Sequence, residues 1–508
     1  MSKTVRGNLS SPPSRRRATA IQALGGYAIT SITIVQGLLL IPLYLHYIGA
    51  HMYGLWLASG GLLGMLGMMD LGINSLVIQR VASAYGQQKQ DQAGAYFING
   101  VAVYLLICVL YAAVGWLVSI WLPDLLKATG SDTELLRGCF QLALLAMVLG
   151  IFNGCLRGFA QALLRPAFPM SSMAGSQILG IVVTVVLLFQ GAGLWAIPIG
   201  MLTVEGLIFG LNLIYTAVLY RRLAAPISWD ADIVKEYVRT SPALVMSRLG
   251  NTLSQESQPL LITVLLSPEI TTAYMLTRRA ADIVFRLLSV IVGSSSGPFA
   301  HLAGEGDNKK TGSIAGQLLA LSASLGLIGF ATYVGANSAF ISLWVGTSFV
   351  LSQGIILFIG IGYLVRTIRG IMGQLLFGLG DFVYPSIMVL FEGLFTVGLS
   401  VLLLNILGVA GVPLALAISA SLSGIIIGVR LRGRLPAAFN YTFILKLLFS
   451  ALLFFAIVMN LAQMDLAIDS WGGFVLLAAI LLASLSIVYG LLHWKMSKEK
   501  IKGVMRRL

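Results

Sequence analysis

Charged residues are scarce in this sequence. Only 10% of its 508 residues are Asp, Glu, Lys or Arg, against about 25% in a typical soluble domain. Apolar residues make up 57% of the chain, and the mean hydropathy is +0.90. This composition excludes an ordinary water-soluble domain and predicts a protein of the lipid bilayer.

Side chains that bind metals or perform covalent chemistry are also few. The three cysteines, Cys108, Cys139 and Cys155, fall inside apolar stretches without CxxC spacing, which favours small core residues over disulfides or metal ligands. The four histidines do not cluster. We find no nucleotide-binding loop, no nucleophile–base arrangement and no metal-ligand spacing. The sequence therefore predicts a protein that is not an enzyme and binds no cofactor or metal.

Long apolar runs are what the chain does contain. Runs of twenty or more residues recur, in place of the ten-residue alternations typical of barrel strands. We expect an all-α polytopic membrane protein with about fourteen transmembrane helices, which the following ranges list. The predicted spans are 19–45, 53–78, 95–122, 136–158, 169–190, 193–219, 241–266, 270–299, 314–338, 350–376, 384–404, 408–429, 442–462 and 473–494.

Lysine and arginine are spread unevenly over the connections between these spans. If both termini are cytoplasmic, most of the 33 cations fall in the tails and the even-numbered connections, to which Arg157 is assigned. The opposite loops hold only Lys127 and Arg137. This asymmetry predicts that both termini are cytoplasmic, and it explains the net charge of +14 without nucleic acid.

A weak internal repeat divides the chain near its midpoint. Four identities recur at an offset of 221: Tyr53 with Tyr274, Gly72 with Gly293, Ala82 with Ala303, and Lys89 with Lys310. We expect an N-terminal six-helix lobe at 1–219, a cytoplasmic amphipathic linker at 220–240 and a C-terminal six-helix lobe at 241–430. Residues 431–508 then form two additional transmembrane helices and a basic cytoplasmic tail. An even number of spans per lobe predicts two halves related about the membrane normal.

Short motifs in the first two spans and in the seventh and eighth spans resemble a known family. They are IPLY at 41–44, YGLW at 53–56, DLG at 70–72 and GPFAHLAGEGD at 297–307. These stretches resemble polysaccharide-biosynthesis flippases, of the lipid-linked oligosaccharide or O-antigen type. That family belongs to the multidrug/oligosaccharidyl-lipid/polysaccharide exporter superfamily.

The resemblance implies a V-shaped, two-lobed flippase in the bacterial inner membrane. Such a protein translocates a polyprenyl-pyrophosphate-linked oligosaccharide by alternating access, for O-antigen, exopolysaccharide or similar surface polysaccharide biosynthesis. The implied partners are this lipid-linked substrate, membrane lipids, protons or sodium ions, and the polysaccharide polymerase and chain-length machinery.

Arginines inside the predicted spans are the candidate substrate-binding residues. A charge at mid-bilayer costs about 2.5–3.5 kcal/mol, so such residues usually face a bundle interior or a water-filled cavity. The candidates form a cationic cavity: Arg248, Arg278, Arg279, Arg286, Arg366 and Arg369. Guanidinium forks suit pyrophosphate oxygens. The alternatives are structural: a buried Arg278–Asp282–Arg286 clasp, and a tie from Arg366 and Arg369 to Glu392.

Five acidic residues are candidates for ion coupling or charge pairing: Glu256, Asp282, Glu392, Glu205 and Asp70. Glu256 lies deepest, within a polar patch that Pro259 follows, and we expect the helix to break there. Asp70 is expected to hold a helix end rather than to carry ions. We expect the clasp at Asp282 and any coupling role at Glu256.

Two other functions stay open. A cation-coupled multidrug exporter of the same superfamily would be expected to have an acidic cavity, against which the surplus arginines argue. A membrane glycan polymerase or ligase would usually need a substantial external loop, and every predicted loop is short. For the flippase and for the multidrug exporter, the energy would come from an ion gradient, the membrane potential or the substrate's own gradient.

Overall fold

The computed structural model describes residues 15–67, 73–240, 242–304, 307–439, 441–462 and 468–505. Every regular element in these ranges is a helix. Ten helical segments of the described ranges are long and apolar enough to cross a membrane, and one of them, Val383–Arg434, contains two helices. The predicted fold class, an all-α multi-pass membrane protein, is confirmed.

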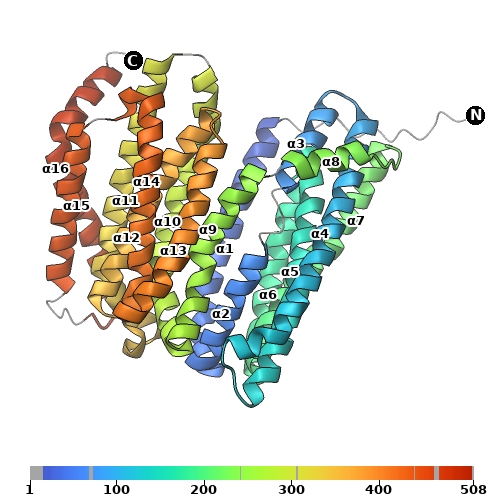
Figure 1. Ribbon diagram of the computed structural model, residues 1–508, viewed down its shortest axis with the longest axis horizontal. Helices are drawn as coiled ribbons and strands as arrows, with labels where there is room; N and C mark the ends of the chain where they lie inside the picture. The colour runs from blue at the N-terminus through green and yellow to red at the C-terminus, as the bar shows by residue number, and fades with distance from the viewer. Residues whose placement is uncertain are drawn as a thin grey trace, which may run out of the picture. The chain divides into compact units, whose positions relative to one another are not determined.

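The chain forms two compact units, Met1–Thr252 and Leu253–Leu508. The helices up to the boundary are α1 (Arg15–Tyr47), α2 (Ala50–Leu66), α3 (Ile73–Gly86), α4 (Gln90–Leu125), α5 (Ser131–Ala162), α6 (Ala167–Phe189), α7 (Ala196–Leu223), α8 (Ala231–Thr240) and α9 (Pro242–Leu265) (Figure 1). The boundary falls within α9. The helices that follow are α10 (Pro268–Gly304), α11 (Asn308–Val345), α12 (Gln353–Gly378), α13 (Val383–Leu407), α14 (Gly411–Arg434), α15 (Tyr441–Ala462) and α16 (Trp471–Met505).

Each predicted span corresponds to one described helix, except the second, which corresponds to two. One further expectation, a break within the seventh span, also differs from the structure. The second predicted span corresponds to α2 and α3, and residues 68–72 between them lie outside the described part of the chain. The expected break at Pro259 is wrong, because α9 continues through this residue. A proline removes one backbone donor, whereas ending a helix inside lipid would leave several polar groups unsatisfied.

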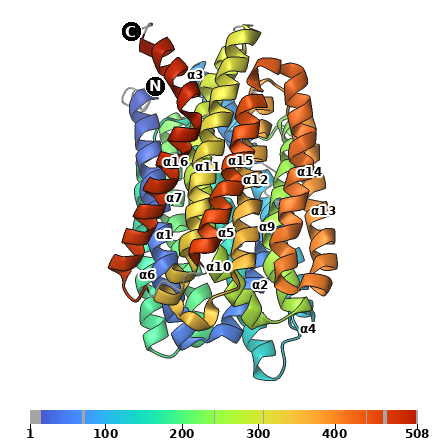
Figure 2. The same cartoon turned by 90° about the vertical axis from the view of Figure 1, so that its left-hand side faces the viewer.

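The two units repeat one pattern of helix contacts. In the first unit α3 packs on α4 and α5, α4 packs on α5, and α7 packs on both α5 and α6. In the second unit the same contacts join α10 to α11 and α12, α11 to α12, and α14 to both α12 and α13. The last two helices, α15 and α16, pack against α11 (Figure 2).

Small residues allow α6 and α7 to approach closely. A Cβ atom on Gly200 would lie 2.0 Å from Thr184 Oγ1, and one on Gly180 would lie 2.1 Å from Val204 Cγ2. Close backbone approach through glycine is typical of helix pairs in membranes, where packing replaces the hydrophobic effect as the driving force.

The amphipathic segment predicted at 220–240 contains α8, which lies across the end of α4 (Figure 1). The Tyr237 hydroxyl donates to the Tyr96 carbonyl at 2.9 Å, and Glu236 forms an ion pair with Arg80. Burial raises the pKa of the Tyr237 phenol above its usual range, so the phenol stays neutral and keeps donating. The apolar face of α8 is therefore packed on protein.

Candidate functional site

A buried arginine on α10 organises the polar residues of the second unit. Arg278 is 6% exposed and donates from Nε and one terminal nitrogen to the two carboxylate oxygens of Asp282, at 3.3 and 3.4 Å. The two residues are one helical turn apart, so their side chains share one face of α10. A buried guanidinium needs such acceptors, because its five donors would otherwise lose their water partners.

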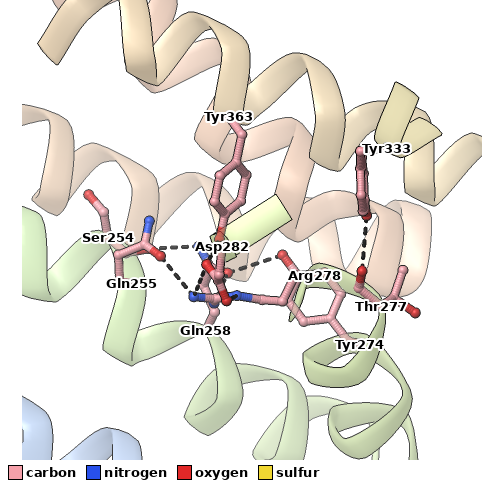
Figure 3. Close-up of polar contacts among 9 residues, drawn as sticks. All are labelled: Ser254, Gln255, Gln258, Tyr274, Thr277, Arg278, Asp282, Tyr333 and Tyr363. Atoms are coloured by element: carbon pink, nitrogen blue, oxygen red, sulfur yellow. Dashed lines mark hydrogen bonds and ion pairs between the residues drawn. The ribbon is translucent and has the colours of Figure 1, made fainter. Parts of the chain in front are cut away.

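Two glutamines on α9 supply the other acceptors for this arginine (Figure 3). Gln258 Oε1 accepts from one terminal nitrogen of Arg278 at 2.9 Å and from the Tyr274 hydroxyl at 3.0 Å. Gln255 Oε1 accepts from the other terminal nitrogen at 2.8 Å. Arg278 therefore makes four hydrogen bonds, all to side chains of α9 and α10.

Tyrosines from α11 and α12 close this cluster on its other side. Tyr363 of α12 donates its hydroxyl to Asp282. Tyr333 of α11 donates to the carbonyl of Thr277 at 3.1 Å, beside the same turn of α10 (Figure 3). The second partner of Asp282 is thus Tyr363 and not Arg286, so the expected Arg–Asp–Arg arrangement is replaced by Arg–Asp–Tyr.

Arg366 lies one turn beyond Tyr363 on α12. It is 8% exposed, and its guanidinium carbon lies 4.8 Å from the centroid of the Phe285 ring. Among the described residues it has no hydrogen-bond or ion-pair partner. A cation–π contact neutralises no charge and leaves the N–H groups of the guanidinium available as hydrogen-bond donors.

Arg369 lies one further turn along α12 and is paired. Its terminal nitrogen lies 2.8 Å from Glu392 Oε1 on α13, and Glu392 also accepts a hydrogen bond from Ser423 on α14. Both members of the pair are buried. Of the two arginines considered as ties to Glu392, the structure joins only Arg369 to it.

The three polar levels are stacked along α12. Tyr363, Arg366 and Arg369 are spaced by three residues, so successive levels are about 4.5 Å apart along the helix axis. The outer levels hold complete charge pairs, Arg278 with Asp282 and Arg369 with Glu392. The middle level holds Arg366, which forms no ion pair with the described residues, although Glu256 and Glu392 lie within electrostatic range of it.

Glu256 on α9 is half-buried, and among the described residues it makes no hydrogen bond or ion pair. It lies within electrostatic range of Arg278, Asp282 and Arg366. Its neighbour Gln255 has a buried Nε2 donor without a partner. The carboxylate is thus near the cluster but is not committed to any one cation within it.

The remaining candidate arginines are not part of this cluster. Arg279 is half-buried and Arg286 is exposed on α10, and neither has an ion-pair partner among the described side chains. Arg248 is exposed on α9, in the part of that helix assigned to the first unit. Asp70 lies outside the described residues.

The first unit contains a smaller polar cluster around Glu205 of α7. The Glu205 carboxylate accepts a hydrogen bond from Asn153 Nδ2 of α5 at 2.7 Å, and the same nitrogen lies 3.1 Å from the Glu205 carbonyl oxygen. Glu205 also lies within electrostatic range of Arg157. This candidate acid is therefore held between α5 and α7.

Arg157, which the charge pattern assigns to a connection between spans, is part of a helix in the structure. It lies inside α5, five residues before the helix ends at Ala162. It is half-buried, and its guanidinium contacts the Asn153 carbonyl oxygen at 3.4 Å and the Met173 sulfur at 2.9 Å. The predicted span ends at residue 158, whereas α5 continues to Ala162, and Glu205 on α7 lies within electrostatic range of Arg157.

The described side chains contain no group of three or more His, Cys, Asp and Glu residues arranged to hold a metal ion. Cys108, Cys139 and Cys155 are buried and form no disulfide. What the second unit does offer is an unpaired guanidinium between two paired ones, a geometry suited to binding a single anionic group.

Known proteins share both part of the sequence and the fold. The MatE family model matches residues 28–186. No curated protein sequence matches the chain. The solved structure of "Lipid II flippase MurJ, inward closed conformation" is 12% identical, with a TM-score of 0.69 over 92% of this chain and 99% of that one.

Multidrug transporters are also similar in structure. A multidrug resistance MATE family transporter of the MOP superfamily in its inward-facing conformation is 14% identical, with a TM-score of 0.64 over 81% of this chain and 95% of that one. Its outward-facing conformation gives 15% identity and a TM-score of 0.60 over 84% and 97%. These neighbours are transporters and flippases rather than enzymes. The chain therefore has the membrane-transporter fold shared by MATE transporters of the MOP superfamily and by the lipid II flippase MurJ.

Proposed function

We propose that the chain is a flippase that moves a polyprenyl-pyrophosphate-linked oligosaccharide across the bacterial inner membrane, by alternating access and with coupling to an ion gradient or the membrane potential. The observation that carries the proposal is Arg366, a buried guanidinium with a cation–π contact and no anionic partner among the described residues. Pyrophosphate oxygens would supply the acceptors that this side chain lacks, because guanidinium forks bind oxygen pairs with two parallel hydrogen bonds.

The neighbouring levels support this role by holding Arg366 in place. Above it Tyr363 is hydrogen-bonded to Asp282, and below it Arg369 is bonded to Glu392. Both arrangements fix neighbouring residues of α12, and neither forms an ion pair with Arg366. The part of α12 that carries Arg366 is thereby held in place, which favours a preorganised site for a substrate head group.

Transport by purified protein in vesicles tests the proposal. Arg366→Gln should lower the initial rate of translocation of a pyrophosphate-linked lipid by about tenfold or more, since charged hydrogen bonds contribute roughly 1.5–3 kcal/mol. Arg366→Lys should recover only part of the rate, because the charge survives without the fork. Arg430→Gln is the matched control. The Arg430 side chain is exposed and already forms an ion pair with Asp381, at 3.0 Å. Wild-type transport by Arg366→Gln would remove the assignment.

A second candidate is cation-coupled export of organic cations. It is favoured by the half-buried Glu256 carboxylate, which has no committed partner among the described residues, and by the likeness to multidrug transporters. The same vesicles distinguish the two functions. An exporter should accumulate an organic cation such as ethidium in a Glu256-dependent manner, whereas the flippase should leave ethidium where it is.

A further inference from the structure

A groove of about 350 Å³ lies on the first unit, at the start of α6 and along α7. Its walls are apolar and include Phe168, Leu211, Ile214 and Val218. Ile214 is 67% exposed and Leu211 is 41% exposed, in helices that carry the composition of membrane spans. In a bilayer these side chains would contact a hydrocarbon chain.

One end of this groove is strongly cationic. Arg165, from the turn after α5, and Arg222, from the last turn of α7, both line it. Tyr215 lies within electrostatic range of both arginines and stacks on Phe168, with ring centroids 4.5 Å apart. Two guanidinium groups and a phenol hydroxyl therefore surround the polar end of an apolar groove.

The backbone around Arg165 is fixed rather than loose. Leu164 takes a left-handed conformation with φ of 61°, and the Arg165 amide donates back to the Ala160 carbonyl at 2.9 Å. Glycine usually occupies this position of a helix-terminating turn, because a left-handed backbone is strained for leucine. The turn fixes the backbone direction at the next residue, Arg165. The start of α6, which follows at once, has no side-chain cap, and its positive dipole end favours a nearby anion.

The part of α7 that lines the groove is about as long as one lipid leaflet is thick. From Leu211 to Arg222 the α7 helix rises by about 16 Å, against about 15 Å for half of the hydrocarbon core. A lipid whose head group lies at the arginines would therefore have its acyl chain along Leu211 and Ile214. The acyl chain would lie at the same membrane depth as in an undisturbed bilayer.

We propose that this groove is a specific site for an anionic glycerophospholipid, with the phosphate at Arg165 and Arg222 and one acyl chain along α7. Basic pockets between transmembrane helices recognise anionic head groups in this way. The proposal is independent of the substrate suggested above, because it uses none of the residues of the α9–α10–α12 cluster.

A second groove on the same helix provides an internal comparison. It encloses about 630 Å³, lies on the side of α7 that faces α4 and α5, and is lined by Leu213 and Thr216. Arg221 is the one cation among its lining residues. The two grooves therefore provide matched pairs of neighbouring residues. Leu213 and Arg221 line the second groove, whereas Ile214 and Arg222 line the first.

Lipid binding to the purified full-length chain tests the proposal. Native mass spectrometry would titrate dioleoyl phosphatidylglycerol, dioleoyl phosphatidylcholine and soluble glycerol 3-phosphate. We expect saturable binding of phosphatidylglycerol that falls about tenfold or more in Arg165→Gln/Arg222→Gln and changes less than about twofold in Arg221→Gln. Ile214→Trp should block the lipid by filling the groove, and Leu213→Trp should not.

Each contrary outcome overturns the proposal. Equal binding of the two phospholipids would show that the arginines confer no head-group selectivity. Glycerol 3-phosphate binding as tightly as the lipid would identify a phosphate site without an acyl component. If Arg165→Gln prevents folding, Arg222→Gln and Ile214→Trp still decide the matter, since both side chains lie on the exposed surface of α7.

Discussion

At the scale of single residues, the cluster around Arg278 is a completed structure whose members depend on one another. Asp282→Asn would leave a buried guanidinium without its anion, and breaking such a pair costs about 3–5 kcal/mol. We therefore expect this variant to lose thermal stability and membrane abundance, measured by the melting temperature of the detergent-purified protein.

The matched double variant separates pairing from transport. Asp282→Asn with Arg278→Met removes both charges, and it should recover much of the lost stability, because an intact apolar replacement is less costly than a lone charge. A stable Asp282→Asn protein whose transport no longer responds to pH would instead assign ion coupling to Asp282.

Glu256 should behave in the opposite way. No described side chain depends on its carboxylate for a hydrogen bond, so Glu256→Gln should remain folded and abundant while transport loses its dependence on the ion gradient. Glu392→Gln is the control, since it removes the anion from the buried pair with Arg369 and should mainly lower stability. The measurement is transport under imposed pH and sodium gradients, normalised to protein amount. An unchanged gradient dependence in Glu256→Gln would exclude coupling at this residue.

The residue types of the site could be predicted, but their partners could not. Arginines within apolar runs are conspicuous in any sequence, and Arg278, Arg366 and Arg369 were identified in this way. That Gln255 and Gln258 bind Arg278 depends on the register of α9 against α10, which periodicity within one helix does not contain. That Glu205 lies within electrostatic range of Arg157 likewise depends on how α7 packs against α5.

At the scale of helices, the contact of α6 with α7 depends on particular glycines. Gly200→Ala would bring a methyl group to 2.0 Å from Thr184 Oγ1, whereas a Cβ on Gly206 of the same helix meets nothing within 4 Å. We expect Gly200→Ala to destabilise the protein by about 1–3 kcal/mol. Gly206→Ala should be neutral or stabilise it by up to about 1 kcal/mol, through helix propensity. Thermal unfolding of both variants measures the difference, and equal melting temperatures would refute the close packing.

The positions of the helices could be predicted from the length of the apolar runs. Where a helix ends, and whether it continues through a proline, could not. A twenty-residue apolar run has few alternatives to a span, so all fourteen predicted spans correspond to helices. Their ends differ by a few residues from the ends of the apolar runs: α5 continues to Ala162, four residues beyond the predicted end. Likewise α9 continues through Pro259, since local propensity does not decide where a helix stops in lipid.

At the scale of the whole molecule, the even number of predicted spans predicts that both ends of the chain lie on one side of the membrane. Charge asymmetry predicts that this side is the cytoplasm. A reporter fused after residue 508 should therefore show cytoplasmic activity, and one inserted at 463–472 should show the opposite location. The same location for both reporters would mean that α15 and α16 do not each cross the bilayer.

The three cysteines have a practical consequence for measuring motion. Cys108, Cys139 and Cys155 form no disulfide and are at most 6% exposed, so thiol reagents should scarcely label the native chain. Cysteines introduced at the exposed positions Gln190 and Asn405, near the ends of α6 and α13, would then carry spin labels or fluorophores almost without background. Distances between the two labels, recorded through a transport cycle, would show how many conformations the protein visits and which of them the substrate stabilises.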